Sequence, residues 1–173
     1  GPEALRDDAM VPSPLMPHLC LDWLADRARA RWGDASVAVI PPSTPLDVPW
    51  QRTAPDGRHY VSHADWMCPV NCIEPRRCPA TRGDRSWSMP DTVQAYAAQQ
   101  PVATDDGMAN GIDRACIFPC THRTHGVGMI DMAPLAAAGA ALGAVETTPP
   151  LRWLIGTTSH CHGALGLLSV VAH

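Results

Sequence analysis

Apolar residues recur at helical spacing near the start of the chain and predict its first helix. Between Pro17 and Trp32 the apolar positions Leu21, Leu24 and Ala28 lie three or four residues apart, and charged residues fill the other side. The run that follows, residues 36–40, is rich in β-branched residues and ends at two prolines. This pattern predicts a short buried strand after the helix.

Two later stretches repeat the order of an apolar run, a polar loop and a second apolar stretch. In the first, a strand is predicted from Arg114 to Phe118, and an alanine-rich helix that Asp131 can cap runs to Leu142. In the second, a strand is predicted from Arg152 to Thr157, and we expect the apolar stretch from Ala164 to be helical. This alternation predicts an α/β fold with a small, mainly parallel sheet flanked by helices.

Residues 41–90 show no sustained hydrophobic period until Asp91, which can cap a short helix that runs to Gln100. The chain has 18 prolines and 13 glycines, and they concentrate in this region. A connection of this length without a helix or strand is unusual unless it is functional. We therefore predict one domain over residues 1–173, with a long irregular insertion rich in proline and cysteine at 41–90.

The composition excludes several classes of protein. Hydrophobic residues make up 46% and charged residues 17% of the chain, which predicts a globular protein rather than a disordered one. The net charge is -4 and the arginines are scattered, so no nucleic-acid partner is expected. All 13 basic residues are arginines, which excludes a Schiff-base lysine and a phosphate-loop lysine.

The ends of the chain and its seven cysteines indicate a compartment. No basic region followed by an apolar run occurs near the start, and the apolar run at residues 164–172 is too short to cross a bilayer. We therefore expect a cytoplasmic protein with no membrane partner. In a reducing compartment, closely spaced cysteines are more often metal ligands or reactive thiols than disulfides. Because Gly1-Pro2 is typical of a cleaved tag, we also expect that residues upstream are missing.

Three cysteines form the most informative motif of the sequence. Cys68, Cys72 and Cys78 follow a Cys-x3-Cys-x5-Cys pattern inside a segment broken by prolines, so three thiolates can converge if the segment folds back. Structural zinc sites usually begin with a tighter Cys-x2-Cys pair. Proline directly after Cys68 and Cys78 is similar to the Cys-Pro pairs near iron-sulfur ligands. We therefore favour a 4Fe-4S cluster over Zn²⁺, with Cys161 as fourth ligand. Free cysteines in the core and a redox dithiol or disulfide are the alternatives.

Histidines gather in the loops that follow the two later strands. His122 and His125 lie in the first loop, and His160 and His162 flank Cys161 in the second. In an extended segment alternate residues share a face, so His160 and His162 point together and Cys161 points away. We therefore expect Cys161 to bind the metal centre and these four histidines to face a pocket as catalytic acids or bases. Two alternatives stay open: the histidines bind zinc while Cys161 packs inward, or each is an ordinary loop residue.

Several short segments resemble the motifs of an uncharacterised family of cysteine-rich microbial proteins. They are Cys68-Pro69-Val70-Asn71-Cys72-Ile73-Glu74-Pro75, Cys78-Pro79-Ala80-Thr81 and Cys161-His162-Gly163. In some members a Rossmann-like domain precedes these motifs. The resemblance implies that Cys161 belongs with the first three cysteines and that this chain is the C-terminal part of a longer protein, but it implies no activity. The family pattern has another cysteine near Ser159, and its absence here argues against a larger cluster.

These observations predict a metal-binding protein with a cysteine-ligated centre beside a histidine-lined pocket. A redox or lyase-type enzyme acting on a small molecule, or serving a redox partner, fits this description. The alternatives are a zinc-dependent hydrolase or lyase that uses the histidine loops, and a non-catalytic metal carrier or sensor. The sequence names no substrate and no oligomeric state.

Overall fold

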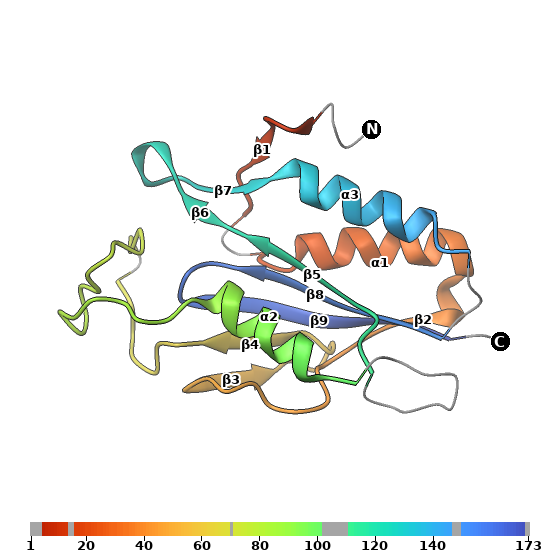
Figure 1. The fold of residues 1–173 in the computed structure, drawn as a ribbon, viewed down its shortest axis with the longest axis horizontal. Helices are drawn as coiled ribbons and strands as arrows, with labels where there is room; N and C mark the ends of the chain where they lie inside the picture. Colours follow the sequence, from red (N-terminus) through yellow and green to blue (C-terminus); the bar gives the residue numbers. More distant parts are fainter. Residues whose placement is uncertain (1–4, 14–15, 70, 102–110, 147–149, 172–173) are drawn as a thin grey trace.

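The main sheet of the computed structural model has six strands (Figure 1). They are β2 (Val37–Ile40), β3 (Trp50–Thr53), β4 (His59–Ser62), β5 (Arg114–Pro119), β8 (Leu151–Thr158) and β9 (His162–Val170). The order across the sheet is β3-β4-β9-β8-β5, and β2 also pairs with β9. The structure describes residues 5–13, 16–69, 71–101, 111–146 and 150–171. The tag-like Gly1-Pro2 and the last residue of the C-terminal apolar run lie outside these ranges.

Helices cover both faces of this sheet (Figure 1). Helices α1 (Leu19–Trp32) and α3 (Met132–Gly143) lie side by side on one face, and α2 (Met89–Gln99) lies on the other. Successive side chains of β8 point to opposite faces of the sheet. Trp153 belongs to the core under α1 and α3, and Leu154 belongs to the core under α2. The result is a three-layer arrangement with two apolar cores, in which helices cover both faces of the sheet.

A small antiparallel sheet extends the molecule beyond the end of β5. Its strands are β1 (Ala9–Met10), β7 (Gly128–Asp131) and β6 (Thr121–His122), with β7 in the middle. Short 3-10 turns occupy Asp34–Ser36 and Thr124–Gly126. The second of these turns is the tip of the β6–β7 hairpin, which carries part of the first histidine loop.

The three helices predicted near residues 17–32, 91–100 and 131–142 are present, but two of their caps differ from the prediction. The N-cap of α2 is Ser88, whose Oγ accepts a hydrogen bond from the Asp91 amide at 3.4 Å. At the start of α3, the Asp131 carboxylate accepts a hydrogen bond from Arg123 at 2.6 Å and makes no side-chain cap.

The prediction of a mainly parallel sheet is wrong. Among the described strands of the main sheet, β5 and β8 pair in parallel, and the other pairings are antiparallel. The error comes from the stretch after Ala164, which forms β9 instead of a helix. This strand is buried on both faces, so it lacks the alternation that marks a strand, and Gly163 and Gly166 are poor helix formers. Because a tight turn joins β8 to β9, the chain reverses instead of crossing over the sheet.

Within the described part of residues 41–90, where an irregular insertion was predicted, the chain forms the β3–β4 hairpin and begins α2 at Met89. Its turn holds Pro55-Asp56-Gly57, where Gly57 has a φ of 83° and the Asp56 carboxylate accepts the Arg58 amide at 3.1 Å. The turn signal was present in the sequence, but each strand beside it has only 4 residues, which is too short to show a period. The residues that follow, 63–69 and 71–88, form no helix or named strand, as predicted.

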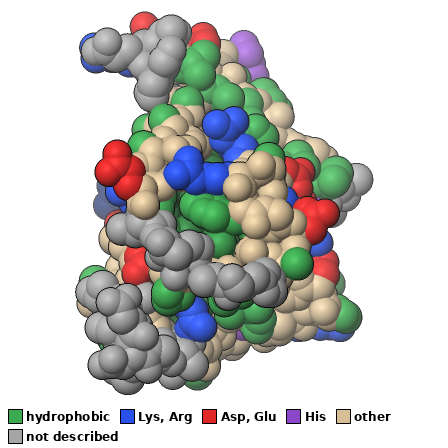
Figure 2. Space-filling model, turned by 90° about the vertical axis from the view of Figure 1, so that its right-hand side faces the viewer, with side chains coloured by type: hydrophobic (Ala, Val, Ile, Leu, Met, Phe, Trp, Pro, Cys, Tyr) green, Lys and Arg blue, Asp and Glu red, His purple; other side chains and the backbone are tan. Residues whose placement is uncertain are grey.

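The ends of α1 and α3 meet on the side of the molecule shown in Figure 2, where arginine side chains lie beside exposed apolar surface. Arg31 of α1 donates hydrogen bonds to the carbonyls of Gly143 and Val145, where α3 ends. A guanidinium in this position satisfies carbonyls that lack a partner within the helix and complements its dipole. Every helix within the described ranges is too short or too polar to cross a membrane.

Candidate metal centre

The parallel pair β5 and β8 brings both histidine loops to one edge of the sheet. Parallel strands end at the same edge, and here Pro119 lies opposite Thr158 in the register. The Cys120 amide donates to the Thr158 carbonyl at 2.6 Å directly beyond that point. The predicted position of the two loops is therefore correct, although it depends on a single parallel pairing.

The cysteine segment, residues 63–88, reaches the same edge and is tied to the β8–β9 turn at both ends. The His63 amide donates to the Cys161 carbonyl at 2.9 Å, and the Met89 amide donates to the His160 carbonyl at 2.9 Å. Backbone bonds therefore place the start and the end of the cysteine segment beside the β8–β9 turn (Figure 1), and this turn carries Cys161. This closure explains how Cys161 comes close to cysteines more than eighty residues earlier in the chain.

The four cysteines predicted as ligands line one cavity. This cysteine cavity has a volume of about 190 Å³, and the other side chains around it include Trp66, Glu74, Arg85 and His162. Its cysteines are Cys68, Cys72, Cys78 and Cys161. Cys78 and Cys161 are buried, and the other two are half-buried. The structure thus brings together the complete set that the sequence grouped.

Short turns present the first three thiols to this cavity. The Cys72 amide donates to the Pro69 carbonyl at 3.0 Å, which closes a turn between the first two cysteines. Cys78 begins a second turn, in which its amide donates to the Gly83 carbonyl and its carbonyl accepts the Arg82 amide, both at 2.8 Å. Burial raises the pKa of the Cys68 thiol, and the neighbouring Cys72 and Cys78 thiols raise it further.

Glu74 connects the cysteine segment to the β8–β9 turn. Its carboxylate accepts hydrogen bonds from the Ser159 hydroxyl at 2.6 Å, the His160 amide at 2.8 Å and the Cys161 amide at 3.1 Å. Burial raises the pKa of this carboxyl, but the three hydrogen bonds outweigh burial and hold its pKa below the ordinary value. The backbone of Glu74 is left-handed, with a φ of 53°, and this conformation turns the side chain toward the loop.

Two side chains donate hydrogen bonds to the cysteine sulfurs. Arg85 donates from Nε to Cys161 Sγ at 3.2 Å and from Nη2 to Cys72 Sγ at 3.7 Å. Trp87 donates from Nε1 to Cys161 Sγ at 3.3 Å. Burial raises the pKa of the Cys161 thiol, whereas these two donors favour its thiolate. One cation is therefore shared between two of the four sulfurs.

One further donor at the cysteine cavity, the buried Arg85 Nη1, has no acceptor among the described residues. Within the same described ranges, no three side chains of Cys, His, Asp or Glu form a group that could hold one metal ion. Four thiols around a small volume, with a cation that has a free N–H beside them, fit an anionic sulfur-ligated cluster.

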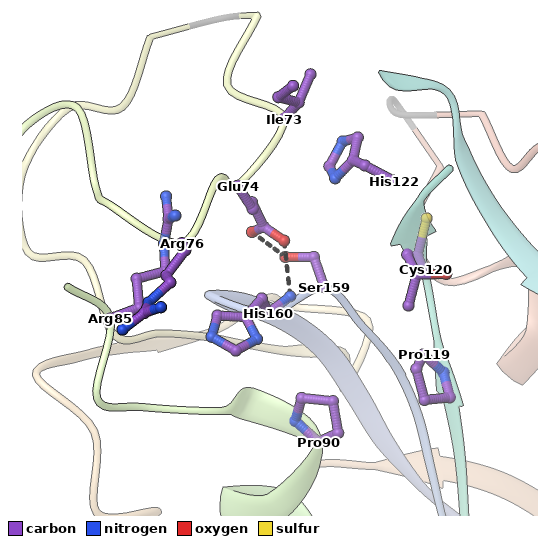
Figure 3. A pocket seen from close by; sticks show the side chains of 11 residues that line it. Ile73, Glu74, Arg76, Arg85, Pro90, Pro119, Cys120, His122, Ser159 and His160 are labelled. Carbon is purple, nitrogen blue, oxygen red and sulfur yellow. Dashed lines mark hydrogen bonds between the residues drawn. The ribbon is translucent and has the colours of Figure 1, made fainter. Parts of the chain in front are cut away.

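The histidines occupy different positions around this centre. His122 and His160 line a cavity of about 390 Å³, the histidine cavity, together with Glu74 and Arg85 (Figure 3). In Figure 3 Glu74 points from the cysteine segment toward Ser159 and His160, with His122 on the far side. These residues from three separate segments thus face one space, as the sequence predicted for His122 and His160.

His162 lines the cysteine cavity, and its hydrogen bond to Ser62 sets its tautomer. Its Nδ1 lies 2.9 Å from the Ser62 hydroxyl, which itself donates to the Ala64 carbonyl at 2.8 Å. Because that hydroxyl has one proton to give, His162 Nδ1 is the donor and Nε2 keeps its lone pair. Burial lowers the pKa of His162, whereas Glu74 raises it. His162 lines the cysteine cavity instead of the histidine cavity.

His125 is not part of these cavity walls. It lies in the 3-10 turn at the tip of the β6–β7 hairpin with a left-handed φ of 56°. The next residue, Gly126, has a φ of 73°, and a Cβ built on it would lie 2.9 Å from Ile73 Cγ2. This hairpin therefore packs closely against the tip of the cysteine segment, which gives the turn around His125 a structural role.

The other cysteines divide between the core and the site. Cys20 and Cys116 are buried in the core under α1 and α3. Burial raises the pKa of Cys116 to about 11, so its thiol is protonated and inert at neutral pH. Cys120 is half-buried at the site edge and lines the histidine cavity.

The sequence did not indicate the roles of Arg85 and Ser62. Arg85 lies seven residues beyond Cys78, and nothing in its neighbourhood marks it as a partner of sulfur. Ser62 reaches His162 because β4 pairs with β9 in the register Ser62 opposite His162. These contacts depend on tertiary pairing, so a motif search along one segment misses them.

A family model described as "Uncharacterized protein, C-terminal domain" matches residues 20–171. The matched part runs from α1 to the end of β9 and includes the whole cysteine segment. No curated protein and no solved structure matches the chain.

Proposed function

The chain belongs to the AF_1314_C family, and from the geometry of its cysteine cavity we propose that it binds an iron-sulfur cluster through Cys68, Cys72, Cys78 and Cys161. One observation carries the proposal: these four cysteines, and a cation that donates to two of them, surround one cavity of about 190 Å³. The description of the family as a C-terminal domain also supports the proposal that a further domain precedes this one in the complete protein.

The arrangement favours a cluster over a single zinc ion. Four thiolates on one zinc ion lie about 2.3 Å from the metal and therefore about 3.8 Å from one another. In a cluster each thiolate binds a different iron, so the ligands surround a volume instead of a point. The four cysteines likewise lie around a cavity. Among the described residues, no three side chains of Cys, His, Asp or Glu lie close enough together to hold a single ion.

A bound cluster of this type supplies one-electron transfer. Hydrogen bonds and positive charge at the sulfurs stabilise the more negative, reduced state, so Arg85 and Trp87 would raise its reduction potential. Glu74 would hold the Cys161 turn in place, and Trp66 would keep water from the centre. We propose a redox protein in which His122 and His160 serve as acid-base groups for a small molecule in the histidine cavity.

Anaerobic purification followed by an absorption spectrum and analysis of iron and sulfide tests the cluster. We expect a brown protein with about four irons and four sulfides per chain. Alanine at any of the four ligand positions should reduce the iron content and bleach the spectrum. The matched controls are Cys20→Ala and Cys116→Ala, which remove buried thiols from the core and should leave the iron content unchanged.

Each alternative gives a different result in the same samples. Protein that stays colourless and free of iron and sulfide, even after anaerobic reconstitution, would refute the cluster. One zinc per chain that depends on the four cysteines would indicate a structural zinc site. Zinc that is lost in His122→Ala and His160→Ala, but kept in the cysteine variants, would favour a zinc-dependent hydrolase or lyase. A carrier or sensor would exchange its metal readily and turn over no substrate.

A further inference from the structure

The cysteine segment projects from the edge of the main sheet, beyond the β8–β9 turn that holds its two ends (Figure 1). Within it Cys78 is buried, whereas Cys68 and Cys72 are half-buried. These two half-buried cysteines therefore bring the wall of the cysteine cavity close to the surface. An electron carrier that serves the proposed cluster would have a short path to it through this segment.

Exposed apolar side chains stand next to both half-buried cysteines. Met67, directly before Cys68, is 94% exposed, and Ile73, directly after Cys72, is 52% exposed. Met67 has the largest exposed fraction of the large apolar side chains among the described residues. A flexible methionine with a second exposed apolar side chain nearby is typical of surfaces that adapt to a partner.

A basic turn, residues 76–85, follows along the segment and includes Cys78. Its two arms are paired through an isolated bridge between Arg77 and Asp84. Arg77 Nε also donates to the Arg82 carbonyl at 2.7 Å, and Arg82 has a left-handed φ of 59°. These contacts fix the backbone of the turn, and both arginines are exposed on it.

The charge of the cysteine segment is opposite in sign to that of the chain. Residues 63–88 hold four arginines and three carboxylates, whereas the whole chain has a net charge of -4. Glu74 and Arg85 are engaged by the β8–β9 turn and by the sulfurs. Arg77 and Arg82 have no carboxylate partner among the described residues. A negatively charged partner would therefore be attracted to this end of the molecule.

We propose that Met67, Ile73, Arg77 and Arg82 belong to a docking surface for a small acidic protein that carries one electron. The carboxylates of the partner pair with the two arginines, and its apolar contact covers Met67 and Ile73. Redox encounter complexes bury less than about 600 Å² on each partner, which a projecting segment can offer. The electron step rests on the proposed function: one electron passes from the reduced carrier, which is oxidised, to the cluster, which is reduced.

The test uses the full chain purified anaerobically, with an acidic plant-type ferredoxin as the probe. Biolayer interferometry measures its affinity in the oxidised form, and stopped-flow absorption measures the rate constant of electron transfer from the reduced form. We expect both to fall as salt rises from about 20 to about 200 mM, because salt screens the attraction. Arg77→Gln with Arg82→Gln should lower both by about tenfold at low salt. A basic c-type cytochrome should bind more weakly than the ferredoxin.

Three variants keep the test decisive. Arg27→Gln with Arg52→Gln removes two exposed charges from α1 and β3 and should change both values by less than about twofold. Arg77→Lys with Arg82→Lys keeps the charge and should bind within about threefold of the wild type. If it loses as much as the glutamine variant, the arginines support the turn and docking is overturned. Met67→Gln should weaken binding by a similar factor at both salt concentrations, because apolar contact is not screened.

Failure of docking and failure of the cluster give different results. A chain without iron refutes the proposed function, and the affinity of the ferredoxin still decides the docking surface. Equal losses in the glutamine variant and the α1–β3 control, no salt dependence, or tighter binding of the cytochrome would overturn docking, whether or not the cluster is present. Self-association that disappears in the glutamine variant would also overturn it, because the surface would then join two copies of the chain.

Discussion

Apolar packing holds the sheet face under α1 and α3, whereas hydrogen bonds hold the edge at the ends of β5 and β8. Under the two helices, the buried set includes Leu24, Trp153 and Leu168, which belong to one apolar core. At the edge, a carboxylate, a guanidinium and backbone amides join segments that are far apart in the sequence. The first region is held by apolar packing alone, while the second depends on a few polar groups and on the proposed cluster.

The largest effect should come from the apolar face. Leu24 is fully buried, so Leu24→Ala should lower the free energy of unfolding by about 2–5 kcal/mol. Leu19→Ala on the same helix removes a side chain that is 38% exposed and should cost much less. Denaturant unfolding followed by far-UV circular dichroism measures both. Equal losses in the two variants would contradict the division into a packed face and a polar edge.

At the edge, Glu74→Gln should loosen the cysteine segment without unfolding the core. The amide keeps one acceptor oxygen but loses the charge and presents an N–H₂ group to the turn, which should cost about 1–3 kcal/mol locally. Hydrogen exchange should therefore become faster at residues 63–88 and 160–161 and stay unchanged in β8 and β9. Glu146→Gln, at an exposed position, is the matched control. Uniform acceleration over the whole chain would show that Glu74 supports the fold instead of the edge.

The sequence predicted one of these regions better than the other. The helical spacing of apolar residues predicted α1, and the alanine-rich composition predicted α3, because both patterns can be read within one short stretch of sequence. The same reasoning failed at β9, where burial on both faces and two glycines left no period. The structure places the four predicted cysteines around one cavity, yet the contacts of the carboxylate and the guanidinium beside them could not be predicted from the sequence. Those contacts arise only after β4, β8 and β9 have paired.

The hairpin tip tests how firmly the edge is assembled. Gly126 has a left-handed φ and a Cβ there would lie 2.9 Å from Ile73 Cγ2, so Gly126→Ala should lower the free energy of unfolding by about 1–2 kcal/mol. Gly143→Ala, where a Cβ meets nothing within 4 Å, is the control and should be neutral or slightly stabilising. Adding Ile73→Ala to Gly126→Ala should restore the share of the unfolding free energy that is lost to the clash with Ile73. The share that is lost to the left-handed backbone of residue 126 should remain. No recovery in this double variant would mean that the hairpin and the cysteine segment are not in contact.

The smallest effect should be a pH dependence at His59, on the strand next to β9. His59 Nε2 faces Gln51 Oε1 at 3.0 Å, and this oxygen can only accept, so Nε2 carries the proton and Nδ1 accepts from the Thr53 hydroxyl at 2.8 Å. Burial lowers the pKa of His59, so the folded state favours the neutral ring.

This shift fixes the direction of the pH effect. The contribution of His59 to stability is complete above its unfolded pKa of about 6.5 and is lost as the pH falls through the folded pKa, because the unfolded state binds the proton first. Each pH unit between the two pKa values is worth about 1.4 kcal/mol. Burial also lowers the pKa of His63 and His162, so the wild type alone cannot isolate His59. The free energy of unfolding should therefore fall less steeply from pH 7 to pH 5 in His59→Gln than in the wild type. Equal slopes would mean that the His59 ring gains its proton without losing the Thr53 contact. The pair of Thr53 on β3 and His59 on β4 would then tolerate a positive charge, which the apolar core under α1 and α3 would not.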